Sequence, residues 1–93
     1  MRIAISALSP EMNGGFDLRF GRCRYFILVD ADSQAWEAVK NPGFHSSGGA
    51  GTSAAQYIAR KGVDVIISGR FGPHACTALQ AADIQMYQAE GGS

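Results

Sequence analysis

The stretch GTSAAQYIARKGVDVIISG, residues 51–69, joins a helical pattern directly to an apolar strand pattern. In its first half, four small or apolar residues recur at the spacing of one helix face: Ala54, Ala55, Ile58 and Ala59. Gly62 stands where such a helix would end, just past the last turn. The second half, VDVIISG, is apolar without alternation, which is typical of a parallel strand covered on both faces. The stretch therefore predicts an α/β fold built around a central parallel strand.

Strand and helix patterns continue on both sides of this stretch. The whole chain predicts strands at 2–8, 25–30 and 35–41, a helix at 51–61, a strand at 63–69, a helix at 72–83 and a strand at 84–88. DADSQ at 30–34 suits a hairpin turn, and Pro73 suits the first turn of the second helix. The apolar face of that helix consists of Ala75, Ala78, Leu79 and Ala82. The order βββαβαβ, with no repeat and no linker, predicts a single domain over residues 1–93.

The connections between these elements set the directions of the strands. A hairpin reverses the chain and each helical crossover restores its direction, so the first, third, fourth and fifth strands run the same way. If the strand order is 3-2-1-4-5, right-handed crossovers place both helices on one face of the sheet. The prediction is a ribonuclease H-like mixed five-stranded sheet. Nucleases with this strand order need acids on the first strand, and RIAISAL has none, so that activity is excluded.

The second face of the predicted sheet has no helix to cover it. Ile3, Ile5, Phe26 and Leu28, with Ile27 and Val29 pointing oppositely, make the strands apolar on both sides. We expect either a further helix after AEGGS, missing from this sequence, or a second subunit in a homodimer to cover this face.

Composition excludes several classes of partner. The eight basic and eight acidic side chains cancel, which gives no sign of a nucleic-acid or membrane-surface partner. No window approaches the roughly 18 apolar residues of a membrane span. Two cysteines are too few for a disulfide framework, and the start of the chain does not resemble a signal peptide. We expect a cytoplasmic protein.

Basic side chains and helix starts gather at the edge where the parallel strands end. The loop 9–23, the segment 41–49, the turn 69–73 and the chain terminus converge there, because the carboxyl ends of these strands share one edge. In open α/β sheets, ligands bind at this edge. The first three segments bring four arginines and only two acids, which are Arg19, Arg22, Arg24, Arg70, Glu11 and Asp17. Helix amino termini near Gly51 and Pro73 add unpaired N–H groups. The edge predicts an anion site, and the alternative is that the glycines only form a flexible loop.

Other chemistry fits the sequence less well. GGAGTS lacks the Lys of a phosphate loop, and GAGTSA at 49–54 matches the dinucleotide spacing without the acid that grips a ribose. The hydroxyls of this segment, Ser46, Ser47, Thr52 and Ser53, have no partners at triad spacing and suit helix capping or anion contact. DADSQ lacks the Gly and Glu of a calcium loop.

A closed zinc site is also disfavoured. His74 and Cys76 are two apart on a helix and point about 200° from one another, unlike an i, i+4 ligand pair. The simplest roles for His45 and His74 are as solvated polar residues, and those for Cys23 and Cys76 are as small core or boundary residues.

Four segments of the chain carry a resemblance to a known family. They are MRIAI at 1–5, RFGRCRYFILVD at 19–30, GGAGTSAAQYIARKGVDVIISG at 48–69 and GPHACTALQAADIQMY at 72–87. Over nearly its whole length the chain resembles the dinitrogenase iron-molybdenum cofactor biosynthesis family of NifX-like proteins. The resemblance implies a small ribonuclease H-like domain that binds molybdenum- or iron-containing sulfide clusters. The same family includes the orange proteins, which hold a molybdenum-copper sulfide cluster without many cysteine ligands.

The resemblance and the edge together imply a non-enzymatic carrier or store of an anionic metal-sulfur cluster, which exchanges it with donor and acceptor proteins. The predicted cluster-binding residues are Arg19, Phe20, Gly21, Arg22, His45, Gly49, Ala50, Gly51, Thr52, Gly69, Arg70, Phe71, Gly72, Pro73 and His74. Cys23 and Cys76 are the candidate sulfur ligands to metal. Two alternatives stay open: a regulatory or interaction module that keeps an empty anion pocket, and a binder of phosphate or nucleotides.

Overall fold

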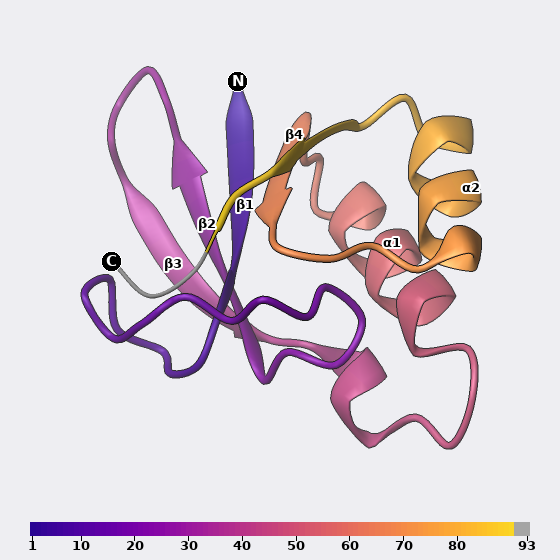
Figure 1. Cartoon of the computed structure of the whole chain (residues 1–93). Coiled ribbons are helices and arrows are strands. Elements are labelled where there is room, and N and C mark those ends of the chain that lie inside the picture. Colours follow the sequence, from indigo (N-terminus) through magenta and orange to yellow (C-terminus); the bar gives the residue numbers. More distant parts are fainter. Residues whose placement is uncertain (91–93) are drawn as a thin grey trace.

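Five strands form one mixed sheet in the order β3-β2-β1-β4-β5 (Figure 1). The computed structural model describes residues 1–90 of the chain. Its elements are β1 (Arg2–Ala7), β2 (Tyr25–Asp30), β3 (Trp36–Lys40), the 3₁₀ helix η1 (Pro42–His45), α1 (Ala50–Arg60), β4 (Val65–Ser68), α2 (Pro73–Ala81) and β5 (Gln85–Gln88). Strand β1 is antiparallel to β2 and parallel to β4, β2 is antiparallel to β3, and β4 is parallel to β5. The predicted strand order and directions are confirmed.

The main difference from the predicted elements is η1. The sequence predicts a loop at 41–49, but the side chain of Asn41 accepts a hydrogen bond from the N–H of Gly43 and starts a single helical turn with Pro42 in its first positions. Several ends also move by one or two residues. Strand β1 stops at Ala7, because the next N–H, that of Leu8, donates to the carbonyl of Gly15 within a loop.

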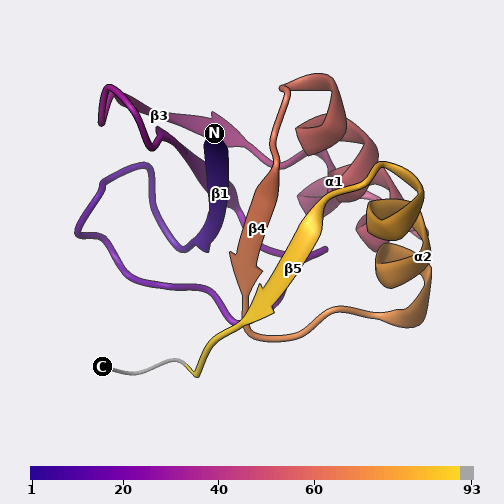
Figure 2. The same ribbon diagram turned by 90° about the horizontal axis from the view of Figure 1, so that it is seen from above.

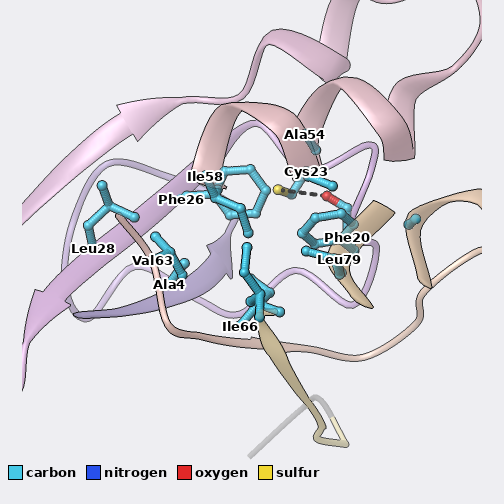
Figure 3. Close-up of a cluster of buried hydrophobic side chains, with 13 residues drawn as sticks. Ala4, Phe20, Cys23, Phe26, Leu28, Ala54, Ile58, Val63, Ile66 and Leu79 are labelled. Carbon is cyan, nitrogen blue, oxygen red and sulfur yellow. Dashed lines mark hydrogen bonds between the residues drawn. The ribbon is translucent and has the colours of Figure 1, made fainter. Parts of the chain in front are cut away.

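Both helices pack on the same face of the sheet, as predicted (Figure 2). From the strands, the side chains that join this core include Ala4, Phe26, Leu28 and Ile66. From the helices, Ala54, Ala55, Ile58, Ala75 and Leu79 meet them. The ring of Phe20 lies 5.5 Å from that of Phe26 and 5.4 Å from that of Phe71, centroid to centroid. Figure 3 shows Phe20 and Cys23 within this cluster, so the loop between β1 and β2 is anchored by its own buried residues.

The register decides which residues lie on the face without helices. Ile3 pairs with Val29 and Ile5 with Ile27, so these four side chains share that face. The expectation that placed Ile3 and Ile5 with Phe26 and Leu28 is wrong. Phe26 and Leu28 alternate with Ile27 along β2, so their side chains point to the helices.

The face without helices stays partly open within residues 1–90. Trp36, paired with Val29, is 46% exposed, and Tyr87, paired with Ile67, is 56% exposed. Close to the carboxyl edge, the loop before β2 bridges Phe16 to Ala7. The expected further helix after AEGGS lies outside the described residues. None of the helices in the described part of the chain has the length and apolar character needed to cross a membrane.

Candidate functional site

A pocket of about 310 Å³ opens at the carboxyl edge of the sheet, between the loop before β2 and the starts of both helices. We call it the arginine pocket. Its lining residues are Arg19, Phe20, Gly21, Arg22, Gly49, Ala50, Gly51, Arg70, Gly72, Pro73, His74 and Ala75. No Asp or Glu lines it within the described chain. Its volume lies near the lower end of the range of about 300–1,000 Å³ that is usual for small-ligand sites.

Two helix amino termini point into the arginine pocket. Helix α1 begins after Gly49 and α2 after Gly72, and neither residue has a side chain that could cap the first N–H groups. The first-turn N–H groups of a helix have no partner inside the helix, and they carry the positive end of its dipole. A guest with negative charge would supply the acceptors that these two helix starts lack.

Backbone contacts hold the walls of the pocket together. A Cβ on Gly21 would lie 2.8 Å from the nitrogen of Gly51, and a Cβ on Gly51 would lie 2.9 Å from the Cβ of Ala75. Both distances are shorter than van der Waals contact, so only glycine lets the three chain segments approach this closely. The width of the pocket is therefore set by main-chain packing.

Arg19 is held by a buried carboxylate. Asp17 is only 3% exposed, and it accepts hydrogen bonds from the backbone N–H, Nε and Nη2 of Arg19 at 2.9, 3.2 and 3.1 Å. This pairing raises the pKa of Arg19 above its usual value. The backbone of Asp17 is fixed in turn, because its N–H and carbonyl both bond to Ser6 of β1. Arg19 therefore reaches the pocket in a fixed orientation, with its charge balanced by a neighbour.

Arg22 and Arg70 supply positive charge without a carboxylate partner in the described chain. Arg22 donates from Nη1 to the carbonyl of Ser46. Arg70 is exposed, and its backbone is bridged to the loop before β2, since Phe20 donates to its carbonyl and its N–H donates to Leu18. This bridge places Arg70 beside Arg19 at the rim.

The two histidines lie in different places. His74, exposed in the first turn of α2, lines the arginine pocket. His45, at the end of η1, lines a separate hollow with Arg24 and Lys40. The structure therefore does not bring His45 together with the other predicted cluster-binding residues.

The cysteines lie away from the pocket lining. Cys23 is fully buried, donates from Sγ to the carbonyl of Phe20 at 3.3 Å, and belongs to the core. Burial raises the pKa of its thiol to about 12, which disfavours the thiolate that would bind a metal. Cys76 is half-buried on α2. In residues 1–90, no group of three His, Cys, Asp or Glu side chains could hold a metal ion.

The remaining predicted residues surround the lining without forming it. Gly69 packs against Leu18 and borders another hollow, Phe71 stacks on Phe20, and Thr52 lies in the first turn of α1. Two contributors were missed by sequence reasoning. Ala75 lines the pocket. Asp17, expected at this edge only as one of two acids, orients Arg19, and the signal for that role was its place two residues before an arginine.

Comparison with known proteins gives relatives over nearly the whole chain. The chain is 45% identical to the orange protein from Desulfovibrio gigas, solved in its apo form, with a TM-score of 0.90 over 94% of this chain and 73% of that one. It is 33% identical to the Thermotoga protein TM1290 of the DUF35 family, with a TM-score of 0.85 over 99% of this chain and 78% of that one. It is 32% identical to the Methanocaldococcus jannaschii protein MJ0580 over 96% of this chain and 75% of that one.

A family model covers the chain from end to end. The model described as dinitrogenase iron-molybdenum cofactor matches residues 1–93. The matched structures share the mixed sheet and both helices, so sequence and fold agree. The chain belongs to the dinitrogenase iron-molybdenum cofactor family, whose NifX-like and orange-protein branches it resembles.

Proposed function

We propose that the arginine pocket binds an anionic metal-sulfur cluster, and that the chain carries or stores this cluster during cofactor biosynthesis without catalysing a reaction. The observation that carries the proposal is the convergence of two uncapped helix starts with Arg19, Arg22 and Arg70 on one pocket that no carboxylate lines in the described chain.

The chemistry of these donors suits a sulfide cluster. The sulfides of a molybdenum- or iron-containing cluster carry negative charge, and they accept hydrogen bonds from amides and guanidinium groups. Phe20 and Ala75 add apolar walls that contact polarisable sulfur. Among the described lining residues, His74 is the one whose side chain binds metals well, so the cluster would be held mainly as a finished anion rather than built on protein ligands.

The comparisons support this role at the level of the family. The family model names the iron-molybdenum cofactor, and the matched orange protein structure is an apo form. A molybdenum-copper or iron-molybdenum sulfide is the cargo that these relatives suggest, with maturation proteins as donors and acceptors. The cysteines, neither of which forms a disulfide, suit the reducing cytoplasm.

Metal loading under anaerobic conditions tests the proposal. The protein is incubated with molybdate, copper and sulfide, desalted, and examined by visible absorption and elemental analysis. We expect a coloured protein with stoichiometric molybdenum. Arg22→Gln combined with Arg70→Gln should lower the bound metal at least tenfold. The charge-matched control Arg60→Gln combined with Lys61→Gln, at the far end of α1, should not lower it. A colourless, metal-free wild-type protein would contradict the proposal.

A second candidate is an interaction module, favoured by the exposed aromatic side chains Trp36 and Tyr87 on the sheet face without helices. A homodimer through this face would bury both residues. Light scattering after size-exclusion chromatography tests it. Under this candidate, the wild-type protein is a dimer, and Trp36→Lys converts it into a monomer.

A further inference from the structure

A second hollow, of about 240 Å³, opens at the same edge of the sheet as the arginine pocket. We call it the hairpin hollow, because it lies where the hairpin of β2 and β3 meets η1. Its lining residues are Arg24, Tyr25, Lys40, Asn41, Phe44 and His45. None of them lines the arginine pocket.

The floor of the hairpin hollow is rigid. Asn41 is 2% exposed, and its side-chain amide uses both ends: Oδ1 accepts from Gly43 at 2.9 Å, while Nδ2 donates to the carbonyls of Gly21 and Cys23 at 3.0 and 2.8 Å. Tyr25 pairs with Lys40 in the sheet. These bonds fix η1 against the hairpin, so the hollow is formed before any ligand arrives.

One cation of the hollow is held in place by stacking. The guanidinium carbon of Arg24 lies 4.7 Å from the ring centre of Phe44, and the ring of His45 meets Phe44 edge-on with its centroid at 4.8 Å. A guanidinium that stacks on an aromatic face keeps its N–H groups available around its edge. Arg24 is thereby aligned to donate to a ligand while it makes no side-chain hydrogen bond in residues 1–90.

The charge of the hollow is one-sided. Arg24 and Lys40 are positive, His45 adds a further nitrogen donor, and no Asp or Glu lines the hollow in the described chain. Arg19 in the neighbouring pocket, by contrast, is balanced by Asp17. Like charges held near one another without counter-ions repel, and an anion placed between them relieves this repulsion.

We propose that the hairpin hollow is a second binding site, for a small molecule that carries carboxylate or phosphate groups. Oxyanions fit these donors better than sulfides do, because the hollow offers a planar guanidinium, an ammonium and a phenol, which hydrogen-bond compact oxygen acceptors. The proposal is independent of the cluster cargo.

Titration followed by amide NMR tests the proposal with two probes, inorganic phosphate and malonate. Each is added to about 20 mM at constant ionic strength, with chloride as the matched control anion. We expect saturable shifts of Arg24, Tyr25 and the amides of 43–45. Lys40→Gln should weaken the affinity at least fivefold, because it removes one of the two positive charges of the hollow. The fold should be kept, because Lys40 pairs with Tyr25 through its backbone alone and its exposed side chain makes no hydrogen bond in residues 1–90.

Two further variants separate this site from the arginine pocket. Arg70→Gln should leave the shifts at the hairpin hollow unchanged, although it impairs cluster loading. Arg24→Gln should abolish them, and its unfolding curve shows whether the fold is kept. Shifts that follow chloride equally, do not saturate, or persist in Lys40→Gln would overturn the proposal. A cluster-free protein with an intact oxyanion site would contradict only the proposed cargo.

Discussion

The buried carboxylate of Asp17 accepts three hydrogen bonds from Arg19, two residues further along the chain. The Asp17 carboxylate has two opposite effects on anion binding at the arginine pocket. It lowers the local positive charge, but it also fixes the Arg19 guanidinium in place. We expect orientation to matter more, because the hydrogen bonds to the buried carboxylate are charge-assisted, whereas a charge at an open rim is partly screened by solvent and salt.

Asp17→Asn should therefore weaken the binding of tetrathiomolybdate about tenfold, although it makes the pocket more positive. It should also lower the free energy of unfolding by about 1–2 kcal/mol. Calorimetric titration and urea unfolding measure the two quantities. Glu11→Gln is the charge-matched control, since Glu11 is exposed in the same loop and should leave both unchanged. Tighter binding by Asp17→Asn would show that charge outweighs orientation.

The close packing of Gly21 on Gly51 predicts a large effect from a single methyl group. Gly21→Ala places a Cβ against the backbone of Gly51, which cannot move as a side chain would, and should destabilise the fold by about 1–3 kcal/mol. Gly48→Ala is the matched control, because its Cβ would meet nothing within 4 Å. Urea unfolding compares the two. Equal stabilities would mean that the backbones can separate at little cost.

Gly72 offers a change of binding without a change of fold. Its backbone is extended, and a Cβ there would meet nothing within 4 Å, so Gly72→Ala should leave the unfolding temperature within about 2 °C of wild type. Because Gly72 lines the pocket at the start of α2, the added methyl should still obstruct the approach of the proposed cluster to the N–H groups. Metal content after loading, compared with Gly48→Ala, measures this, and full loading of Gly72→Ala would argue against contact with this helix start.

The buried thiol of Cys23 predicts a pH dependence of stability. Its pKa in the folded chain is about 12, against 9.0 for the ordinary group, so above pH 9 the unfolded chain releases a proton that the folded chain keeps. The unfolded state then binds fewer protons, and stability falls as pH rises from about 9 towards 12, by up to about 1.4 kcal/mol per unit.

Cys23→Ala isolates this contribution to the pH dependence. The variant is less stable at pH 7, because it leaves a small cavity, but the gap from wild type should narrow between pH 8.5 and 10.5. Because the two proteins differ only at position 23, other contributions to the pH dependence cancel in the difference. Urea unfolding at each pH gives the result, and a gap that stays constant would show that the thiol titrates normally in the folded state.

The amide of Asn41 joins three segments and predicts the effect of its loss. Asn41→Ala leaves the carbonyls of Gly21 and Cys23 and the N–H of Gly43 without their partner, at a buried site. The free energy of unfolding should fall by about 2–4 kcal/mol. Asn13→Ala in an exposed loop serves as the control. A loss below 0.5 kcal/mol would mean that water replaces the amide.

The fold can be predicted from local patterns in the sequence. The unbroken apolar run before Gly69, the helical spacing of Ala54 and Ile58, and the turn-forming DADSQ fix strand type, helix face and hairpin, and chain handedness then gives the strand order. The convergence of Arg19, Arg70 and two helix starts follows from that order alone.

The features of the site and sheet that could not be predicted depend on contacts between residues far apart in the sequence. His45 turns towards Arg24 and Lys40 because Asn41 bends the chain into η1, and no local pattern reports that the amide would reach across to Gly21. Cys23 is equally ambiguous beside a site, until burial among Phe20 and Phe26 assigns it to the core. The faces of Ile3 and Ile5 needed the pairing register, which a single strand does not carry.

The contact of Gly21 with Gly51 separates two properties of the arginine pocket that usually vary together. The close approach of the backbone segments sets the diameter of the pocket, whereas its electrostatic potential depends on a few arginine side chains at the rim, which substitution can replace. If the pocket binds an anion as proposed, substitutions of these arginines would change the charge of the ligand that fits, while the size of the ligand would stay the same. A homologue that has exchanged Arg70 for a neutral residue should hold a guest of the same dimensions and smaller charge.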